Sequence, residues 1–243
     1  MTIKPIKTHK IDGKQTILDV LEHYLPSLTE QSIVAITSKI VAICEGRVVK
    51  MGTIDKAALI QKEADYYIRS KSSNDYAILT IKNNMFIPSA GIDESNGNGY
   101  YILWPNNPQK TAVATRKWLA KRFKLNNVGV IITDSKTTPL RWGTTGVALG
   151  YSGFEGIKNY VGKKDIFGRA LEVTKANVVD PLAAMAVLAM GEGAEQTPIA
   201  ILEDPGFVSF KKNYPSKKEL ALLNIGLKDP MYQPLLAGAP WRS

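Results

Sequence analysis

The chain has 243 residues, of which 44% are hydrophobic and 22% are charged. This is the composition of a globular protein and excludes wholesale disorder. The single cysteine, Cys44, excludes an internal disulfide and the zinc sites that need several cysteines. The longest apolar run, residues 181–190, is far shorter than the roughly 20 residues of a membrane helix, and no signal-peptide run follows the basic start. We therefore expect a cytoplasmic protein with no membrane partner.

The net charge of +9 comes from 31 Lys and Arg residues against 22 Asp and Glu residues. Such an excess is compatible with anionic partners, which include nucleic acids, phosphorylated small molecules and membrane surfaces, and also with solubility alone. The basic residues occur in scattered pairs such as Lys163 and Lys164, without a basic stretch interleaved with aromatic residues. Since the sequence also contains no recognisable nucleic-acid module, we expect no nucleic-acid partner.

Short β-branched or aromatic segments predict strands at 33–37, 76–82, 100–104, 128–133 and 199–202. Helical patterns lie between them, at 16–25, 54–69, 109–123, 181–190 and 216–224.

Capping residues define two of these helices. Thr53 is the expected N-cap of the second helix. The fourth helix is expected to start with Asp180 as N-cap and Pro181 in its first position, and to stop at Gly191. Its four alanines predict a closely packed neighbour.

The mixed order of helices and strands predicts an α+β fold with flanking helices. We assign residues 1–243 to a single domain and leave a division into two subdomains open.

The usual nucleotide and nucleophile signatures are missing. The segment GIKNYVGKK at 156–164 is one residue too long for a phosphate loop, and neither Ser nor Thr follows its last lysine. Gly97-Asn98-Gly99 predicts a turn. His9 and His23 are the two histidines, and His23 falls in a predicted amphipathic helix. Hydrolysis through a protein nucleophile is therefore not expected.

Polar motifs instead follow the predicted strands. They are TSK at 37–39, SAGIDESN at 89–96 and TDS at 133–135, with MGE at 190–192 after the alanine-rich helix. Carboxylates in such places suit Mg²⁺ or Mn²⁺, which take oxygen ligands and bind phosphates through them, and Lys39 offers a point charge to phosphate. Each motif alone is typical of a turn or cap. Together they favour a metal-assisted phosphate site.

Six blocks of this sequence resemble the coenzyme F420-0:L-glutamate ligase (F420-0:gamma-glutamyl ligase) family. In chain order they are TSKIVAICEGR (37–47), SAGIDESN (89–96), VIITDS (130–135), GVALGYSG (146–153), DIFGRAL (165–171) and VVDPLAAMAVLAMGE (178–192).

The resemblance implies the family fold as an intertwined homodimer. It also implies a GTP-dependent ligase that joins L-glutamate to the deazaflavin F420-0 through an acyl phosphate. Two divalent ions, Mn²⁺ or Mg²⁺, and a helper K⁺ would assist. Such a reaction needs positioning and charge neutralisation rather than a protein nucleophile.

Site residues are carried over by position. Asp93 and Asp134 would hold one metal ion, and Ser135 with Glu192 would help to hold the second. The nucleotide would meet Ser38 and Lys39 at its phosphates, Asn96, and the backbone from Gly191 to Gln196. Arg169 is our own candidate for an anionic substrate group, with a surface salt bridge as the alternative.

Three departures from the family pattern are visible. Ile43 stands where the family has a lysine that contacts the nucleotide, so phosphate affinity should fall unless another lysine substitutes. KTHK at 7–10 replaces a near-neutral segment that lies against the nucleotide, which places His9 there. Pro181 replaces a carboxylate. Two alternatives therefore stay open: a paralogous nucleotide-dependent ligase for another amino acid or acidic acceptor, and a nucleotide-binding relative without catalysis.

Overall fold

The computed structural model describes residues 1–68, 78–229 and 231–243. Helices and strands are mixed along the chain, which confirms the predicted α+β class. Within the described residues, no helix combines the length and the apolar character needed to cross a bilayer.

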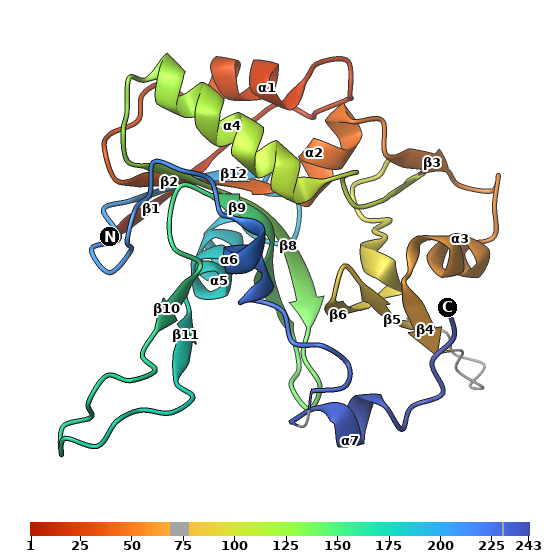
Figure 1. Cartoon of the computed structure of the whole chain (residues 1–243). Helices are drawn as coiled ribbons and strands as arrows, with labels where there is room; N and C mark the ends of the chain where they lie inside the picture. The colour runs from red at the N-terminus through yellow and green to blue at the C-terminus, as the bar shows by residue number, and fades with distance from the viewer. Residues whose placement is uncertain (69–77, 230) are drawn as a thin grey trace.

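A five-stranded sheet forms the centre of the molecule (Figure 1), in the order β1-β12-β2-β8-β9. Its strands are β1 (Thr2–Ile6), β12 (Ile199–Glu203), β2 (Ser32–Thr37), β8 (Val128–Thr137) and β9 (Thr144–Ser152). β2 and β8 pair in parallel, while every other neighbouring pair is antiparallel. The parallel pair places the ends of β2 and β8 at the same edge of the sheet.

Helices cover both faces of this sheet (Figure 1). One face packs against α1 (Ile17–Tyr24), α2 (Ser38–Cys44) and α4 (Pro108–Arg122), and the other against α5 (Val179–Met190) and α6 (Lys217–Ala221). Because strand side chains alternate between faces, Ile36 joins the first core and Ala35 the second. This two-sided burial explains the continuous apolar run of β2 and confirms the predicted covered sheet.

α5 and β9 approach closely, as the alanines of the helix predict. Ala183 and Ala186 are completely buried. A methyl group on Gly146 of β9 would lie 2.6 Å from the carbonyl oxygen of Ala183. Small residues on both elements therefore permit this contact.

A smaller layer stands beside the main sheet, with a core of its own. It contains α3 (Lys56–Glu63), a sheet of β4 (Tyr66–Ile68), β5 (Leu79–Lys82) and β6 (Met85–Pro88), the 3-10 turn η1 (Ser89–Gly91), and the pair β3 (Val48–Lys50) and β7 (Tyr100–Ile102). The chain also has a hairpin arm, residues 160–174, which projects beyond β10 (Ile157–Asn159) and β11 (Lys175–Asn177) (Figure 1), and a short α7 (Gln233–Leu236).

Two predicted helix starts are wrong. Asp55, not Thr53, caps α3 by accepting the Ala58 N–H, while the Thr53 hydroxyl donates to the carbonyl of Lys50. α5 begins at Val179, so Asp180 lies inside its first turn rather than at its N-cap. Its stop at Gly191 is confirmed, with a φ of 80°.

Two predicted segments are longer than the elements that form. α3 ends at Glu63, whereas the prediction ran to residue 69, and β5 begins at Leu79 rather than at residue 76. Positions 69, 76 and 77 lie outside the described residues. The strand predicted at 100–104 ends at Ile102.

Candidate functional site

The candidate site lies at the edge of the sheet where β2 ends and its pairing with β8 stops. β2 ends at Thr37, which pairs with Thr133 of β8, and Lys39 follows it in α2. The sequence placed the strand end at residue 133, but β8 continues to Thr137 and pairs with β9, so Asp134 lies inside the strand, just past its pairing with β2. The stretch before β12 joins the same edge, because the Thr37 N–H donates to the carbonyl of Pro198 at 3.0 Å. Sheet topology therefore brings together three motifs that are far apart in the sequence.

Asp93 reaches this edge from the loop between β6 and β7, as the sequence predicts. Its Oδ2 lies 2.6 Å from Nζ of Lys39, and its Oδ1 accepts the Ser95 N–H at 2.7 Å. Although desolvation acts to raise the pKa of Asp93, the Lys39 ammonium and the Ser95 N–H hold it below its usual value. Asp93 is thus a carboxylate that is ionised and already paired with a cation.

Asp134 is the second carboxylate, and within the described residues it forms no ion pair, although the charge of Lys39 opposes the rise of its pKa. Its Oδ1 accepts the N–H of Ser135 at 2.9 Å, and its Oδ2 accepts the indole N–H of Trp104 at 2.5 Å. Desolvation raises the pKa of Asp134 to about 6 against these hydrogen bonds, and the nearby charge of Asp93 adds to the rise. A desolvated carboxylate next to another carboxylate is an environment that a cation would stabilise.

Glu192 lies just past the end of α5, across from β8 and β9. Its two carboxylate oxygens accept the Ser135 hydroxyl at 3.2 Å and the Thr144 hydroxyl at 3.1 Å. A cavity of about 380 Å³ opens beside it, lined mainly by apolar side chains of α5 and by the start of β9, including Met185 and Leu188. Ser135 and Glu192 are therefore brought together, as predicted, at the mouth of this cavity.

Two further contacts join the loops of the site. Asn96 donates its side-chain N–H to the carbonyl of Gly193 at 3.0 Å, and the Thr8 N–H donates to the carbonyl of Gln196 at 2.9 Å. The predicted nucleotide residues Asn96, Gly191 and Gln196 thus lie in connected loops. Ser38 is buried at the start of α2.

Two predicted site residues are engaged elsewhere. His9 uses one ring nitrogen towards the hydroxyl of Tyr24 and the other towards Gln15. Arg169 lies in the projecting arm, where its backbone pairs with Asp165, and Figure 1 shows that this arm extends away from the main sheet. Within one chain, the structure does not bring Arg169 to the carboxylates.

The described residues contain no group of three or more His, Cys, Asp or Glu side chains arranged to hold a metal ion. The pair Asp93 and Asp134 still fits a divalent ion, because Mg²⁺ is commonly held by one or two carboxylates, with waters and substrate phosphates completing its shell. The buried carboxylate of Asp134, beside Asp93 and without an ion pair among the described residues, is the observation that supports this fit.

Sequence reasoning missed Trp104 and Thr144, which contact Asp134 and Glu192. Trp104 read as part of a strand, and Thr144 lies in β9, a strand that the sequence analysis did not identify. The signal available for Trp104 was an indole within an otherwise apolar segment, because a buried indole N–H needs an acceptor.

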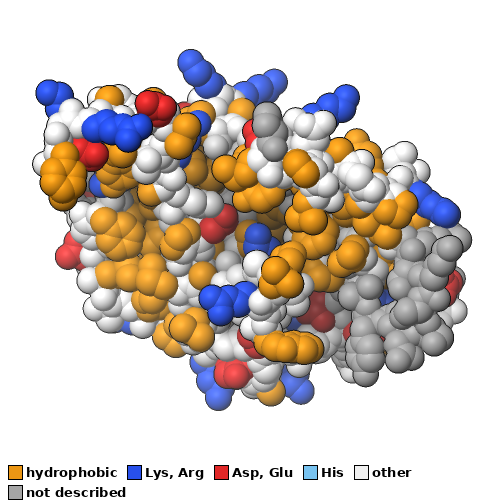
Figure 2. All heavy atoms as spheres, turned by 90° about the horizontal axis from the view of Figure 1, so that it is seen from below, with side chains coloured by type: hydrophobic (Ala, Val, Ile, Leu, Met, Phe, Trp, Pro, Cys, Tyr) orange, Lys and Arg blue, Asp and Glu red, His pale blue; other side chains and the backbone are white. Residues whose placement is uncertain are grey.

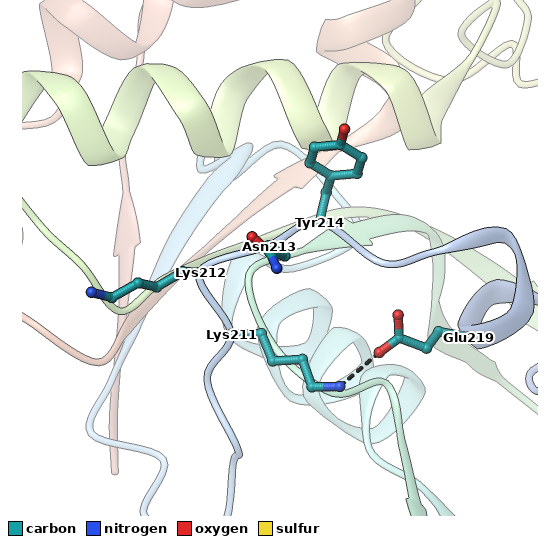
Figure 3. A pocket seen from close by; sticks show the side chains of 5 residues that line it. All are labelled: Lys211, Lys212, Asn213, Tyr214 and Glu219. Carbon is teal, nitrogen blue, oxygen red and sulfur yellow. Dashed lines mark hydrogen bonds and ion pairs between the residues drawn. The ribbon is translucent and has the colours of Figure 1, made fainter.

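A second cavity, of about 310 Å³, lies below α4 and is lined by Lys211, Lys212, Asn213, Tyr214 and Glu219 (Figure 3). The Lys211 ammonium points towards Glu219, at 2.7 Å, and also pairs with Glu155 at 3.1 Å. Its charge is therefore already neutralised, and this cavity shares no residue with the predicted site.

Comparisons with known proteins show the family to which this chain is similar. The family model described as F420-0:Gamma-glutamyl ligase matches residues 5–204. A protein of Methanosarcina mazei named coenzyme F420:L-glutamate ligase is 33% identical over 207 residues, which cover 77% of this chain and 81% of the relative. Proteins with the same name from Methanopyrus kandleri and Methanocaldococcus jannaschii are 32% and 30% identical, over 72% and 78% of this chain and 75% and 82% of their own lengths.

Proposed function

Because the chain belongs to the F420-0:gamma-glutamyl ligase family, we propose that it is a GTP- and metal-dependent ligase that joins L-glutamate to coenzyme F420-0. The curated relatives are named for the ligation of glutamate to this coenzyme. The observation that carries the proposal to this chain is the meeting of Asp93, Asp134 and Lys39 just past the point where the parallel pairing of β2 with β8 stops.

The proposed chemistry has two transfers. A carboxylate oxygen of the acceptor attacks the γ-phosphorus of GTP, the bond to the β–γ bridging oxygen breaks, and GDP leaves. The α-amine of glutamate then attacks the acyl carbon and loses a proton, and inorganic phosphate leaves with the electrons of the broken C–O bond. No side-chain nucleophile is required, which suits a site of carboxylates, hydroxyls and one lysine.

Asp93 and Asp134 would hold one divalent ion, and Ser135 with Glu192 would help to hold the second. When bound, these ions would neutralise the phosphate oxygens during transfer. Lys39 now neutralises Asp93 at 2.6 Å. An ion at Asp93 would take over that role and release the Lys39 ammonium towards the phosphates of GTP.

The cavity beside Glu192 supports the placement of an organic group at the same edge. It is walled mainly by apolar atoms of α5 and lies next to the loop of Gly191. Since ligand pockets are mostly apolar with a few polar groups at the rim, we place the nucleotide or the deazaflavin ring there.

A homodimer is part of the proposal. Leu140 and Trp142 at the tip of the β8–β9 hairpin, and Ile166 and Phe167 in the projecting arm, are almost fully exposed. Seen from below, the molecule shows hydrophobic side chains over much of one face (Figure 2). Large apolar side chains on protruding hairpins are typical of surfaces that pack against another chain.

The test is a reaction of the purified protein with F420-0, L-glutamate, GTP and Mn²⁺. The expected product is F420-0 extended by glutamate, detected by mass spectrometry, with phosphate released in equal amount. The activity of the Asp134→Asn variant should fall by at least about 100-fold. The variant loses the charge that would hold the divalent ion, and loss of such transition-state stabilisation costs several kcal/mol. Glu22→Gln, which removes an exposed carboxylate paired with Arg122, is the matched control and should keep its activity. A fully active Asp134→Asn enzyme would contradict the assignment.

Ile43 favours a second candidate, a ligase of the same chemistry for another acid. It lies in α2, and the amino-terminal segment approaches it at Gly13, where an added methyl group would lie 2.8 Å from the Ile43 carbonyl oxygen. A screen of carboxylic acceptors and amino acids would separate the two candidates. Phosphate release with a different acid, and none with F420-0, would favour the second.

A further inference from the structure

Trp104 is completely buried and lies directly behind Asp134. It follows β7 and belongs to the boundary between the smaller layer and the main sheet. Its indole N–H donates to Oδ2 of Asp134 at 2.5 Å. We propose that Trp104 is a positioning residue that fixes the Asp134 carboxylate for its divalent ion; this inference rests on the proposed function.

The indole is held from several sides. A methyl group on Gly91 would lie 2.0 Å from Nε1 of Trp104, so the backbone of η1 lies against the edge of the ring. Nζ of Lys82 lies 5.5 Å from the ring centroid, within cation–π range. The carbonyl of Trp104 accepts Nε of Arg47 at 3.0 Å. The ring therefore cannot rotate away from Asp134 without disturbing the elements around it.

The two cations that contact Trp104 are themselves fixed by one carboxylate. Glu63, at the end of α3, accepts Nζ of Lys82 at 2.7 Å and a terminal nitrogen of Arg47 at 2.6 Å, both through Oε2. Lys82 is buried and Glu63 is largely buried. Desolvation lowers the pKa of Lys82 against the opposing effect of Glu63. Such a cluster is sensitive to the loss of any member, because a buried charge would remain unpaired.

The geometry gives Trp104 a role beyond packing. Each oxygen of Asp134 has one fixed N–H donor, Ser135 on Oδ1 and Trp104 on Oδ2. A carboxylate oxygen has two lone pairs, so one donor on each sets the rotamer and still leaves acceptor capacity for an ion. Partners of this kind orient metal ligands, and their loss commonly weakens metal affinity by about 10- to 100-fold.

The test compares Trp104→Phe with Trp118→Phe. Phenylalanine keeps an aromatic ring but cannot donate a hydrogen bond. Trp118, in α4, packs against Phe123 and the core between the helices and the main sheet, and has no contact with Asp134 among those described. Free Mn²⁺ is measured by electron paramagnetic resonance during titration of the full-length protein. Trp104→Phe should bind Mn²⁺ about 10- to 100-fold more weakly than wild type, and Trp118→Phe should have the Mn²⁺ affinity of wild type. A folded Trp104→Phe protein with unchanged Mn²⁺ affinity would overturn the inference.

If Trp104→Phe does not fold, nuclear magnetic resonance of wild type and Asp134→Asn tests the same contact. The chain has four tryptophans, so four indole N–H signals are expected in a ¹⁵N-labelled sample. The Trp104 signal should lie downfield and exchange slowly, and Asp134→Asn should move it more than the other three. A Trp104 signal that does not respond to Asp134→Asn would also overturn the inference. Mn²⁺ binding that depends on Trp104, in a protein that makes no glutamyl product, would leave this inference standing and contradict the proposed function alone.

Discussion

Lys39 and Asp93 form an ion pair of 2.6 Å that links the two layers of the molecule. Lys39 belongs to the first turn of α2, above the main sheet, and Asp93 to the loop that follows the smaller sheet. The same lysine also donates to Ser95, through its carbonyl and its hydroxyl. This ion pair holds the two layers together at the site. A divalent ion that binds Asp93 would have to compete with the Lys39 ammonium.

Replacement of Lys39 by alanine should separate ion binding from nucleotide binding. Loss of one charge-assisted hydrogen bond to phosphate costs about 1.5–3 kcal/mol, so the affinity for GTP with Mn²⁺ should fall by about 10- to 100-fold. Mn²⁺ alone should bind at least as tightly, because the competing ammonium is gone. Titration calorimetry measures both affinities, with Lys62→Ala on the exposed side of α3 as the control. Unchanged affinity for GTP would remove Lys39 from the phosphate site.

The raised pKa of Asp134 predicts how stability depends on pH without metal. The pKa of Asp134 is about 6 in the folded protein, against its ordinary value of 3.8 in the unfolded chain. Between these values the folded state binds more protons. The contribution of Asp134 to the free energy of unfolding is therefore fully present below about pH 4 and is lost as the pH rises through about 6. At pH 8 the loss amounts to at most about 3 kcal/mol.

Asp134→Asn should consequently make the metal-free protein more stable than wild type at pH 8, and the difference should shrink at pH 4.5. Denaturant unfolding in the presence of a chelator measures it. Saturating Mn²⁺ should reverse the order, because an ion that binds only the folded wild type stabilises it. A variant that is less stable than wild type at pH 8 without metal would contradict the assigned environment of Asp134.

Much of this fold could be predicted from hydrophobic periodicity. The apolar run at 128–133 and the segment at 199–202 gave strands that fill the centre of the main sheet. α2 was hidden, because Ser38–Cys44 follows its strand without any turn residue and its apolar side chains read as a continuation. β9 was hidden as well, because its glycines serve close packing against α5 and α4 and weaken the strand pattern.

The site could be predicted as a set of motifs but not as an arrangement. The sequence predicted Asp93, Asp134 and Glu192 as polar residues after strands or a helix; Asp93 lies in the loop after β6 and Glu192 lies past α5, whereas Asp134 lies inside β8. Their proximity depends on the parallel pairing of β2 with β8 and on the return of the chain into β12. Pairing between segments so far apart leaves no local signal. The same reason hid the contact between Trp104 and Asp134.

Gly91 should be the glycine of this site least tolerant of substitution. It has a φ of 70°, and a methyl group there would lie 2.0 Å from Trp104 Nε1. Gly91→Ala should therefore destabilise the fold by about 3 kcal/mol or more, through both strain and the displaced indole. Gly99 is the matched control, because its φ is 85° and nothing lies within 4 Å of the added methyl, so Gly99→Ala should cost about 1 kcal/mol. If denaturant unfolding shows that the two variants lose equal free energies of unfolding, the close contact between Gly91 and the Trp104 indole is contradicted.

The exposed hairpins predict the effect of substitutions on the oligomeric state. Trp142→Ser with Leu140→Ser, or Phe167→Ser with Ile166→Ser, should shift the proposed dimer to monomer in sedimentation velocity experiments. These four side chains are almost fully exposed in one chain, and each buried large side chain contributes about 1.5–3 kcal/mol to association. Leu188→Ser on α5, which is also exposed, tests whether the face beside the cavity belongs to the interface. A dimer that persists in both hairpin variants would exclude the hairpins from it.

The central claim is that Asp93 and Asp134 form an ion-dependent site for a guanine nucleotide. The most direct measurement is calorimetric titration of wild type and Asp134→Asn with GTP, GDP and ATP, each with and without Mn²⁺. We predict that wild type binds guanine nucleotides only with Mn²⁺ and prefers them to ATP, and that Asp134→Asn loses the Mn²⁺-dependent part of this binding. Nucleotide binding that is equally tight without Mn²⁺, or in Asp134→Asn, would contradict the claim.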